Sequence, residues 1–298
     1  MPEPRPLTGI LLMLGAVFCF AALDATSKHM AQTFPVPMLV WARYSVHFLL
    51  MLAFLAPSMR LKLIATAHPR MQITRGLTLV ATSLFGMAGF AILPLAEATA
   101  FLFVAPLIVV ILARFLLHEN ITAGRWLAVA AGFAGALLIA RPGGALSFTG
   151  VIFMALAAIC YAFYQVQTRR LSATENTLTM LFYTALIGAL SMTLATPFYW
   201  GGPLPDMLQT LQIISMGIFG GVGHLLLTRA FRHAPASLLS PITYAQIIWA
   251  TLFGWMFYGH LPDALSSIGI GVIAGSSLFI ALSERIRKPS PPDTEIAY

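Results

Sequence analysis

Long apolar runs dominate the sequence, and each is about as long as a helix needs to be to cross a bilayer. A transmembrane helix requires about 20 apolar residues, and ten stretches of that kind follow one another along the chain. They cover residues 8–30, 36–56, 74–94, 97–117, 123–141, 148–168, 177–199, 209–230, 236–258 and 264–283. The pattern predicts an all-α membrane protein with ten transmembrane helices.

Short segments rich in proline and glycine separate these runs, and none is long enough to form a separate soluble domain. The first run follows Arg5, as the apolar part of a signal peptide would. However, it extends to about Met30 and lacks a small-residue cleavage site, so we expect a retained helix. The tail at 288–298 contains three prolines and is predicted to be disordered.

Composition supports the membrane class and argues against two others. Hydrophobic residues make up 59% of the chain and charged residues 9%, whereas soluble domains have about 45–50% and about 25%. The net charge of +7 is explained by a basic cytoplasmic side, so no nucleic-acid partner is expected. Cys19 and Cys160 both lie in apolar runs, which argues against a disulfide framework and a Cys/His metal cluster.

The distribution of Lys and Arg predicts the orientation. With the N-terminus in the cytoplasm, the inner face holds fourteen of these residues, and the outer connections hold only Lys28 and Arg141. The remaining cation, Arg43, lies within the second run. Because cytoplasmic loops carry the excess of Lys and Arg, we expect a multi-pass protein of the bacterial inner membrane with both termini cytoplasmic.

The two halves of the chain resemble each other at a spacing of 140–141 residues. Five positions near the start recur in the second half: Gly9, Met13, Ala16, Cys19 and Ala21 match Gly150, Met154, Ala157, Cys160 and Ala162. Five helices is an odd number, so the second half must enter the membrane inverted. The sequence therefore predicts inverted five-helix repeats at 1–143 and 144–287 around a central cavity, where such repeats place a substrate site.

Small residues and prolines add local detail to this arrangement. Gly135 in the fifth run, four residues after Ala131, matches Gly275, four residues after Gly271 in the tenth. This spacing lets helices approach closely, so we expect the fifth and tenth helices to touch. Pro106 removes a backbone donor from the fourth helix and is expected to kink it.

A family resemblance rests on two segments. The first contains Ala100 to Pro106, Glu119, Ile121, Thr122, Trp126, Leu127, Gly132 and Gly135, and the second contains Ala236 to Pro241, Gln246, Trp249, Ala250 and Gly259. Together they resemble the two copies of the EamA-type module of the drug/metabolite transporter superfamily. The resemblance implies ten helices, two modules and cytoplasmic termini. The chain departs from the pattern at His260, the counterpart of Glu119. Among the branches, it is most similar to exporters of aromatic and other neutral amino acids.

Ionisable groups inside a membrane are costly and usually functional or paired. Asp24 shares a helix face with Ser27 and Lys28. It either pairs locally with Lys28 or binds a substrate ammonium or a proton. Arg43 either holds a substrate carboxylate through its planar fork or stabilises the fold by pairing with Asp24 or Glu97.

Aromatic and hydrogen-bonding side chains recur on four of the predicted helices. Because such polar groups are unfavourable against lipid, we predict that many of them line a cavity; interhelix bonding, packing or an interfacial belt is the alternative for each. The candidate substrate-binding residues are Asp24, Trp41, Arg43, Tyr44, His47, Phe101, Tyr161, Tyr164, Gln165, Tyr244, Gln246 and Trp249.

Motifs for direct ATP use and for catalysis are absent from the sequence. The chain has three lysines and none follows a glycine, so no Walker A loop exists. It also lacks a paired acidic motif, a His-x-x-x-His site and a Gly-x-Ser-x-Gly elbow. We therefore expect no enzyme activity, no cofactor and no metal. Arg43 is the only cation well inside a predicted helix, which argues against dianionic substrates such as sugar phosphates.

The leading hypothesis is a secondary transporter or facilitator that exports aromatic and other neutral amino acids by alternating access. One alternative is a transporter of another small apolar metabolite, such as a vitamin, a base or a drug. Another is a non-transporting membrane scaffold or receptor. The expected partners are a small-molecule substrate and the lipid bilayer. The sequence leaves open proton coupling, which Asp24, His47 or His224 would serve, and the oligomeric state.

Overall fold

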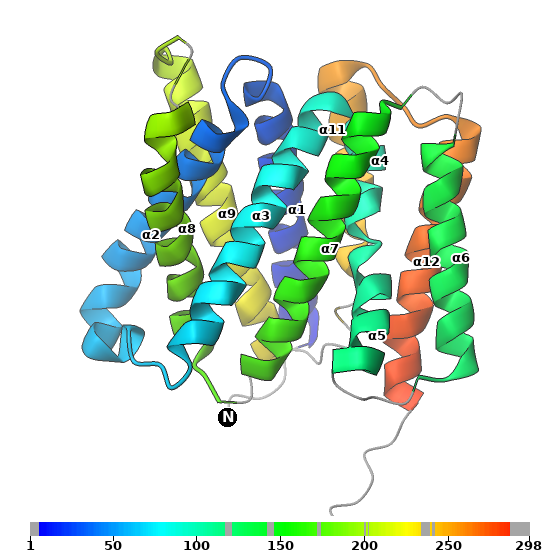
Figure 1. The fold of residues 1–298 in the computed structure, drawn as a ribbon, viewed down its shortest axis with the longest axis horizontal. Coiled ribbons are helices and arrows are strands. Elements are labelled where there is room, and N and C mark those ends of the chain that lie inside the picture. Colours follow the sequence, from blue (N-terminus) through cyan, green and yellow to red (C-terminus); the bar gives the residue numbers. More distant parts are fainter. Residues whose placement is uncertain are drawn as a thin grey trace, which may run out of the picture.

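A computed structural model describes residues 6–116, 121–141, 146–171, 174–199, 201, 203–233, 239 and 242–286. The regular structure in these ranges is helical (Figure 1). The helices are α1 (Pro6–Met30), α2 (Val36–Met59), the 3-10 turn η1 (Arg60–Leu63), α3 (Pro69–Ile92), α4 (Leu95–Leu102), α5 (Ala105–Leu116), α6 (Ala123–Ala140), α7 (Phe148–Leu171), α8 (Thr177–Tyr199), α9 (Met207–His233), α11 (Ala245–Tyr258) and α12 (Ala264–Ile286).

Eight stretches of the described chain are long and apolar enough to cross a membrane. Seven lie within the single helices α1, α2, α3, α6, α7, α8 and α9, and the eighth, Leu95–Leu112, combines α4 with part of α5. The apolar part of α12, Ala264–Ile280, is shorter. The prediction of an all-α membrane protein is confirmed at this level, whereas the count of ten spanning helices and the inversion of the halves stay predictions.

The fourth apolar run is interrupted between α4 and α5. Phe103 and Val104 form a turn in which their N–H groups donate to Ala100 and Phe101 at 3.0 Å. Pro106 lies just beyond and has no N–H to donate to the Leu102 carbonyl, so the helical ladder fails there. The carbonyl of Phe103 instead accepts a hydrogen bond from Ser277 Oγ on α12 at 3.0 Å. The expected kink is therefore a break, and it exposes Leu102, Phe103 and Pro106 to the interior.

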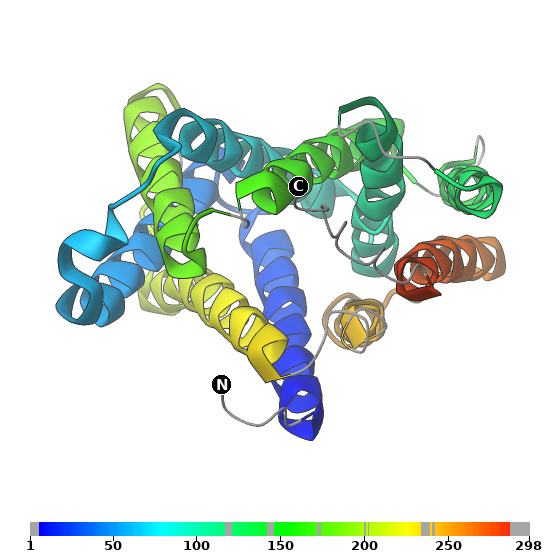
Figure 2. The ribbon, with the colours of Figure 1, turned by 90° about the horizontal axis from the view of Figure 1, so that it is seen from below.

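The closest helix packing joins the two halves of the chain. α1 packs against α9, α3 against α7, α6 against α12 and α2 against α8, and Figures 1 and 2 show these pairs side by side. Each pair takes one helix from residues before 143 and one from residues after it. The interior is consequently built between the halves and does not lie within either one.

The contact predicted between the fifth and tenth helices is confirmed as the packing of α6 on α12. Its closest approach is between Gly135 and Gly269: a Cβ atom added to Gly135 would lie 2.9 Å from the Gly269 carbonyl oxygen. The predicted partners Gly271 and Gly275 instead have nothing within 4 Å of an added Cβ. The helix pair was therefore predicted correctly, but Gly269 makes the contact.

Candidate functional site

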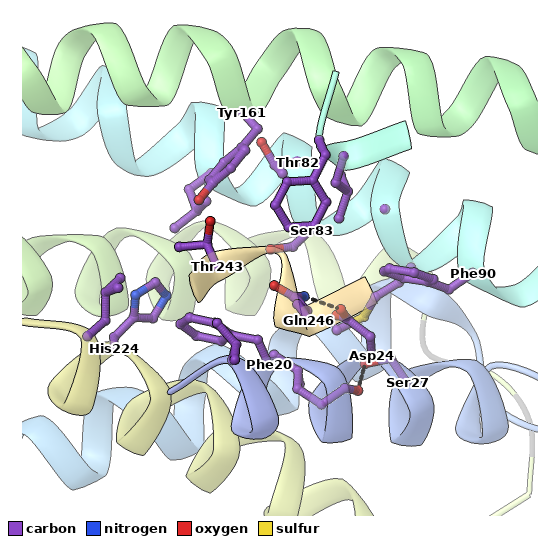
Figure 3. A pocket seen from close by; sticks show the side chains of 18 of the residues that line it. Phe20, Asp24, Ser27, Thr82, Ser83, Phe90, Tyr161, His224, Thr243 and Gln246 are labelled. Atoms are coloured by element: carbon purple, nitrogen blue, oxygen red, sulfur yellow. Dashed lines mark hydrogen bonds between the residues drawn. The ribbon is translucent and has the colours of Figure 1, made fainter. Parts of the chain in front are cut away.

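A cavity of about 300 Å³ lies among the helices that join the two halves. Figure 3 shows α3 and α7 along one side of it and α1 and α9 along the other. The lining residues are Val17, Phe20, Leu23, Asp24, Ser27, Arg43, Leu79, Thr82, Ser83, Gly86, Met87, Phe90, Leu102, Phe103, Pro106, Tyr161, Gln165, His224, Leu227, Thr243 and Gln246. Both halves contribute to this lining, which is mostly apolar with a small number of polar groups, as in small-molecule sites generally.

Asp24 brings a carboxylate to the cavity from α1. Its Oδ2 accepts a hydrogen bond from the Gln246 side-chain amide on α11 at 3.0 Å (Figure 3). Lys28, one turn further along α1, turns to α3 instead and donates to the carbonyls of Phe90 and Leu93 at 2.9 and 2.7 Å. Asp24 is thus held by a neutral amide from the other half of the chain, and its local pairing with Lys28 does not form.

Arg43 brings a guanidinium to the same cavity from α2. Its Nη1 donates to Ser83 Oγ on α3 at 3.3 Å, and Ser83 Oγ is also 2.9 Å from the Tyr44 hydroxyl. The Tyr44 ring lies 5.6 Å from the guanidinium carbon, within cation–π range. Arg43 also lies against α9 at Gly220, where an added Cβ would be in ordinary van der Waals contact with Arg43 Nε at 3.5 Å.

Glu97, the other carboxylate considered as a partner for Arg43, binds elsewhere. Its Oε1 lies 3.1 Å from His260 Nε2, beyond the end of α11. Asp24 and Arg43 therefore line one cavity while their hydrogen bonds go to the neutral side chains of Gln246 and Ser83. An acid and a base that are both present but held by neutral groups can each engage an opposite charge on a substrate.

Aromatic rings form much of the remaining wall. Phe20 packs edge-on against His224 with ring centroids 5.0 Å apart, and Tyr161 stacks on Tyr164 at 5.9 Å. Phe103, presented by the break after α4, packs on Tyr244 at 4.9 Å. Such faces suit a planar aromatic ligand, because offset stacking adds to the free energy of burial.

The candidate residues from the sequence divide into three groups by position. Asp24, Arg43, Tyr161, Gln165 and Gln246 line the cavity. A second group supports lining residues from behind. Tyr44 bonds Ser83, Tyr164 stacks on Tyr161, Tyr244 packs on Phe103, and His47 is 4% exposed with its ring stacked 6.1 Å from that of His224.

The third group, Trp41, Phe101 and Trp249, lies outside the lining. Trp41 Nε1 donates to Thr193 Oγ1 on α8 at 3.0 Å. Phe101 is 4% exposed and belongs to the apolar core formed by α4, α5 and their neighbours. Trp249 packs against Phe18 at 5.1 Å. These three side chains pack helices together, which was the alternative given for each aromatic residue. Glu119 and Pro241, named for the family resemblance, lie outside the described residues.

Sequence reasoning missed the contribution of α3. Six of its residues line the cavity: Leu79, Thr82, Ser83, Gly86, Met87 and Phe90. Their spacing of three and four residues is that of one helix face, and this periodicity was the available signal. It went unused because Ser, Thr and Gly are common in membrane helices for packing alone.

Arg75, at the start of the third predicted run, is a buried charge that sequence reasoning did not single out. It is 1% exposed on α3. It donates to Tyr164 Oη at 3.1 Å, Thr168 Oγ1 at 3.3 Å, Thr184 Oγ1 at 2.7 Å and the Met180 carbonyl. These neutral partners come from α7 and α8, so Arg75 joins the two halves of the chain beside the Tyr164–Tyr161 stack.

The sequence is similar to those of several known membrane transporters. The chain is 27% identical to an S-adenosylmethionine uptake transporter of Rickettsia bellii, covering 93% of this chain and 94% of the relative. It is 27% identical to a riboflavin transporter of Rhizobium johnstonii, with 97% and 96% coverage. It is also 27% identical to a pseudopaline exporter of Pseudomonas aeruginosa, with 88% and 92% coverage.

The fold also matches a solved structure. A crystal structure superimposes with a TM-score of 0.67 at 18% identity, covering 95% of this chain and 100% of that one. The sequence model of the EamA-like transporter family matches the chain twice, over residues 7–141 and 148–282. Both matches together cover nearly the whole sequence, so the chain belongs to the EamA-like transporter family and is a membrane transporter by descent.

Proposed function

We propose that this protein is a secondary transporter for a small metabolite in which an ionic, hydrogen-bonding group is attached to a planar aromatic or heteroaromatic ring. The observation that carries the proposal is the presence of Asp24 and Arg43 in one cavity walled by aromatic rings. The two opposite charges balance, so the site suits a neutral or zwitterionic solute. Amides and hydroxyls from Gln165, Gln246 and Thr243 would fix its orientation.

The relatives support a metabolite of this broad class better than amino acids alone. Their names specify S-adenosylmethionine, riboflavin and pseudopaline. The first two of these compounds carry a planar nitrogen heterocycle, which the faces of Phe20, Phe103 and Tyr161 could stack upon. The site would therefore select by ring shape and polar contacts, and related metabolites would compete.

Export of aromatic amino acids is the second candidate. It is favoured by the same acid and base, because an amino acid presents an ammonium for Asp24 and a carboxylate for Arg43. The two candidates differ in the ring of the substrate, which is a planar heterocycle such as that of riboflavin in the first and the side chain of an aromatic amino acid in the second. They agree on the two charged contacts.

Movement of the substrate is proposed to follow alternating access between the two halves. The double family match and the pairing of α1 with α9 and of α3 with α7 support this proposal. The cavity lies between these two pairs (Figure 3), where movement of the α1–α9 pair against the α3–α7 pair would change its access.

The proposal is tested by flux in proteoliposomes. Purified protein is reconstituted and uptake of radiolabelled S-adenosylmethionine, riboflavin and phenylalanine is measured, with and without a pH gradient. We expect saturable flux of at least one compound, lost in Asp24→Asn and Arg43→Gln but retained in Arg70→Gln, whose side chain is exposed on α3. Flux of phenylalanine alone would favour the amino-acid candidate. Flux no greater than in empty liposomes for every compound would contradict transport of this class.

A further inference from the structure

We infer that Lys28 is the latch of a gate that closes one end of the cavity. Ser27 and Phe90 lie together at one end of the cavity, whereas His224 lies at the other (Figure 3). Lys28 follows Ser27 directly, and its ammonium binds the carbonyl of Phe90. The inference rests on the proposed transport function. The predicted orientation places this end on the outer face of the membrane.

The contacts of Lys28 tie the last turn of α1 to the last turn of α3. Its Nζ is 2.9 Å from the Phe90 carbonyl oxygen and 2.7 Å from that of Leu93, although the side chain is only 9% exposed. The final carbonyls of a helix have no partner within the helix and carry its negative dipole end. An ammonium is therefore the matching group for this position.

Further contacts bring α11 into the same closure. The Lys28 ammonium lies 5.2 Å from the centroid of the Tyr258 ring, and the Tyr258 hydroxyl donates to the Ala25 carbonyl at 3.0 Å. Gln32 on the outer side of Lys28 donates to the Ala91 carbonyl at 2.9 Å. Helices from both halves therefore meet around the buried ammonium of Lys28, next to the end of the cavity that Ser27 and Phe90 line.

A charge held in this way suits a gate better than apolar packing does. While closed, the ammonium and carbonyls are dry, and their hydrogen bonds are charge-assisted. When α1 and α11 part from α3, water can solvate all of these groups, so the net cost of opening is modest. Replacing the ammonium by an apolar group would leave two buried carbonyls without a donor, a penalty that opening the gate relieves.

The test uses thiol accessibility, which reports the gate without requiring transport. In a Cys19→Ala/Cys160→Ala background, the cavity residue Thr82 is changed to Cys. A membrane-impermeant maleimide is then applied to right-side-out vesicles. We expect Lys28→Met to label about tenfold faster than the background protein, which corresponds to about 1.4 kcal/mol. The matched control, Lys62→Met, replaces an exposed lysine in η1 and should label at the background rate.

Tyr258→Phe supplies a second, milder variant. It keeps the ring over Lys28 but loses the hydrogen bond to Ala25, so a smaller increase in labelling is expected. If Lys28→Met does not elute as a monodisperse peak in size-exclusion chromatography, the test rests on Tyr258→Phe. Labelling of Tyr258→Phe at the background rate then overturns the inference. A folded Lys28→Met protein that labels at the background rate overturns it as well.

The flux assay separates this result from the proposed function. Faster labelling without flux in the unmodified protein would retain the gate and reject the substrate class. Saturable flux together with unchanged labelling of Lys28→Met would retain transport and reject Lys28 as the latch.

Discussion

Each charged residue of the cavity is held by a neutral hydrogen-bonding partner. Asp24 binds Gln246 at 3.0 Å, and Arg43 binds Ser83 at 3.3 Å. Membrane-embedded charges are usually neutralised by pairing with one another. Here Gln246 and Ser83, which are neutral, orient the two charged side chains. Both charges can therefore still interact with an oppositely charged group of a solute.

Replacing Arg43 by Lys tests whether the shape of the cation matters. Lysine keeps the positive charge but lacks the planar fork that donates to Ser83 and could hold a carboxylate at the same time. We expect KM to rise about tenfold, as for the loss of one charge-assisted hydrogen bond, with a small change in maximal rate. Initial rates in proteoliposomes measure both. An unchanged KM would show that Arg43 acts only as a point charge.

Asp263 provides a prediction about pH outside the membrane-spanning segments. Its Oδ1 accepts the Ser266 N–H at 2.8 Å and its Oδ2 is 2.6 Å from Arg141 Nη2. These interactions, the Ser266 backbone bond first, lower the pKa of Asp263 to about 2. A lowered pKa stabilises the folded state above about pH 4, and the contribution is lost as the pH falls towards 2.

Asp263→Asn should therefore lower Tm slightly near pH 7, and the difference from the unmodified protein should shrink as the pH falls from 5 to 3. The change should be no more than about 2 °C, because exposed ion pairs are weak and the asparagine can still cap α12. Thermal unfolding in detergent at several pH values measures it. A difference that grows on acidification would contradict the assignment.

Among individual residues, the sequence singled out the charged side chains of the cavity better than the rest of its lining. Asp24 and Arg43 stood out because charge is rare in apolar helices. Trp41 and Trp249 also stood out, but indole rings pack helices as readily as they line sites. Ser83 carried no signal of its own, since its role depends on Arg43 and Tyr44, which lie about 40 residues away along the chain.

The helices themselves follow closely from the apolar pattern. The run predicted at 177–199 coincides with α8, Thr177–Tyr199, because Asn176 precedes it and a segment with two glycines and Pro203 follows it. The break between α4 and α5 was anticipated only as a kink at Pro106. Its exact form depends on Ser277 of α12, which accommodates the freed Phe103 carbonyl and has no signal in the local sequence.

Gly135→Ala is expected to destabilise the packing of α6 on α12. The added methyl group would lie 2.9 Å from the Gly269 carbonyl oxygen, and backbone cannot give way as a side chain does. Overpacking of this kind costs about 1–3 kcal/mol. Tm in detergent should fall in Gly135→Ala.

Gly275→Ala is the matched control on α12, since its added Cβ has nothing within 4 Å. Its Tm should stay the same or rise slightly, because alanine favours the helix. An equal loss of Tm in both variants would indicate a general effect of removing glycine and would contradict the packing argument.

The molecule as a whole is held together by contacts between its halves. α1 with α9, α2 with α8, α3 with α7 and α6 with α12 each cross from one family match to the other. Sparse matches in sequence were enough to suggest a repeat. Which helices of the two repeats pack together was seen only in the structure. No local pattern specifies which helix of the second half a given helix will contact.

The orientation of the molecule is still predicted from charge alone and can be measured directly. Fusion of green fluorescent protein to the C-terminus should give fluorescent cells, whereas fusion of alkaline phosphatase there should be inactive. Inserting each reporter at Gly201, in the connection after α8, should reverse the result. Active phosphatase at the C-terminus would overturn the predicted cytoplasmic location.

The burial of Arg75 has a consequence for how the protein is made. Its partners Tyr164, Thr168, Met180 and Thr184 are translated 89 to 109 residues later. Until they emerge from the ribosome, Arg75 lacks these partners, so we expect the final insertion of α3 to wait for the second half. Separate expression of residues 1–143 should consequently yield a fragment that is degraded, and co-expression of residues 144–298 should restore its level on immunoblots.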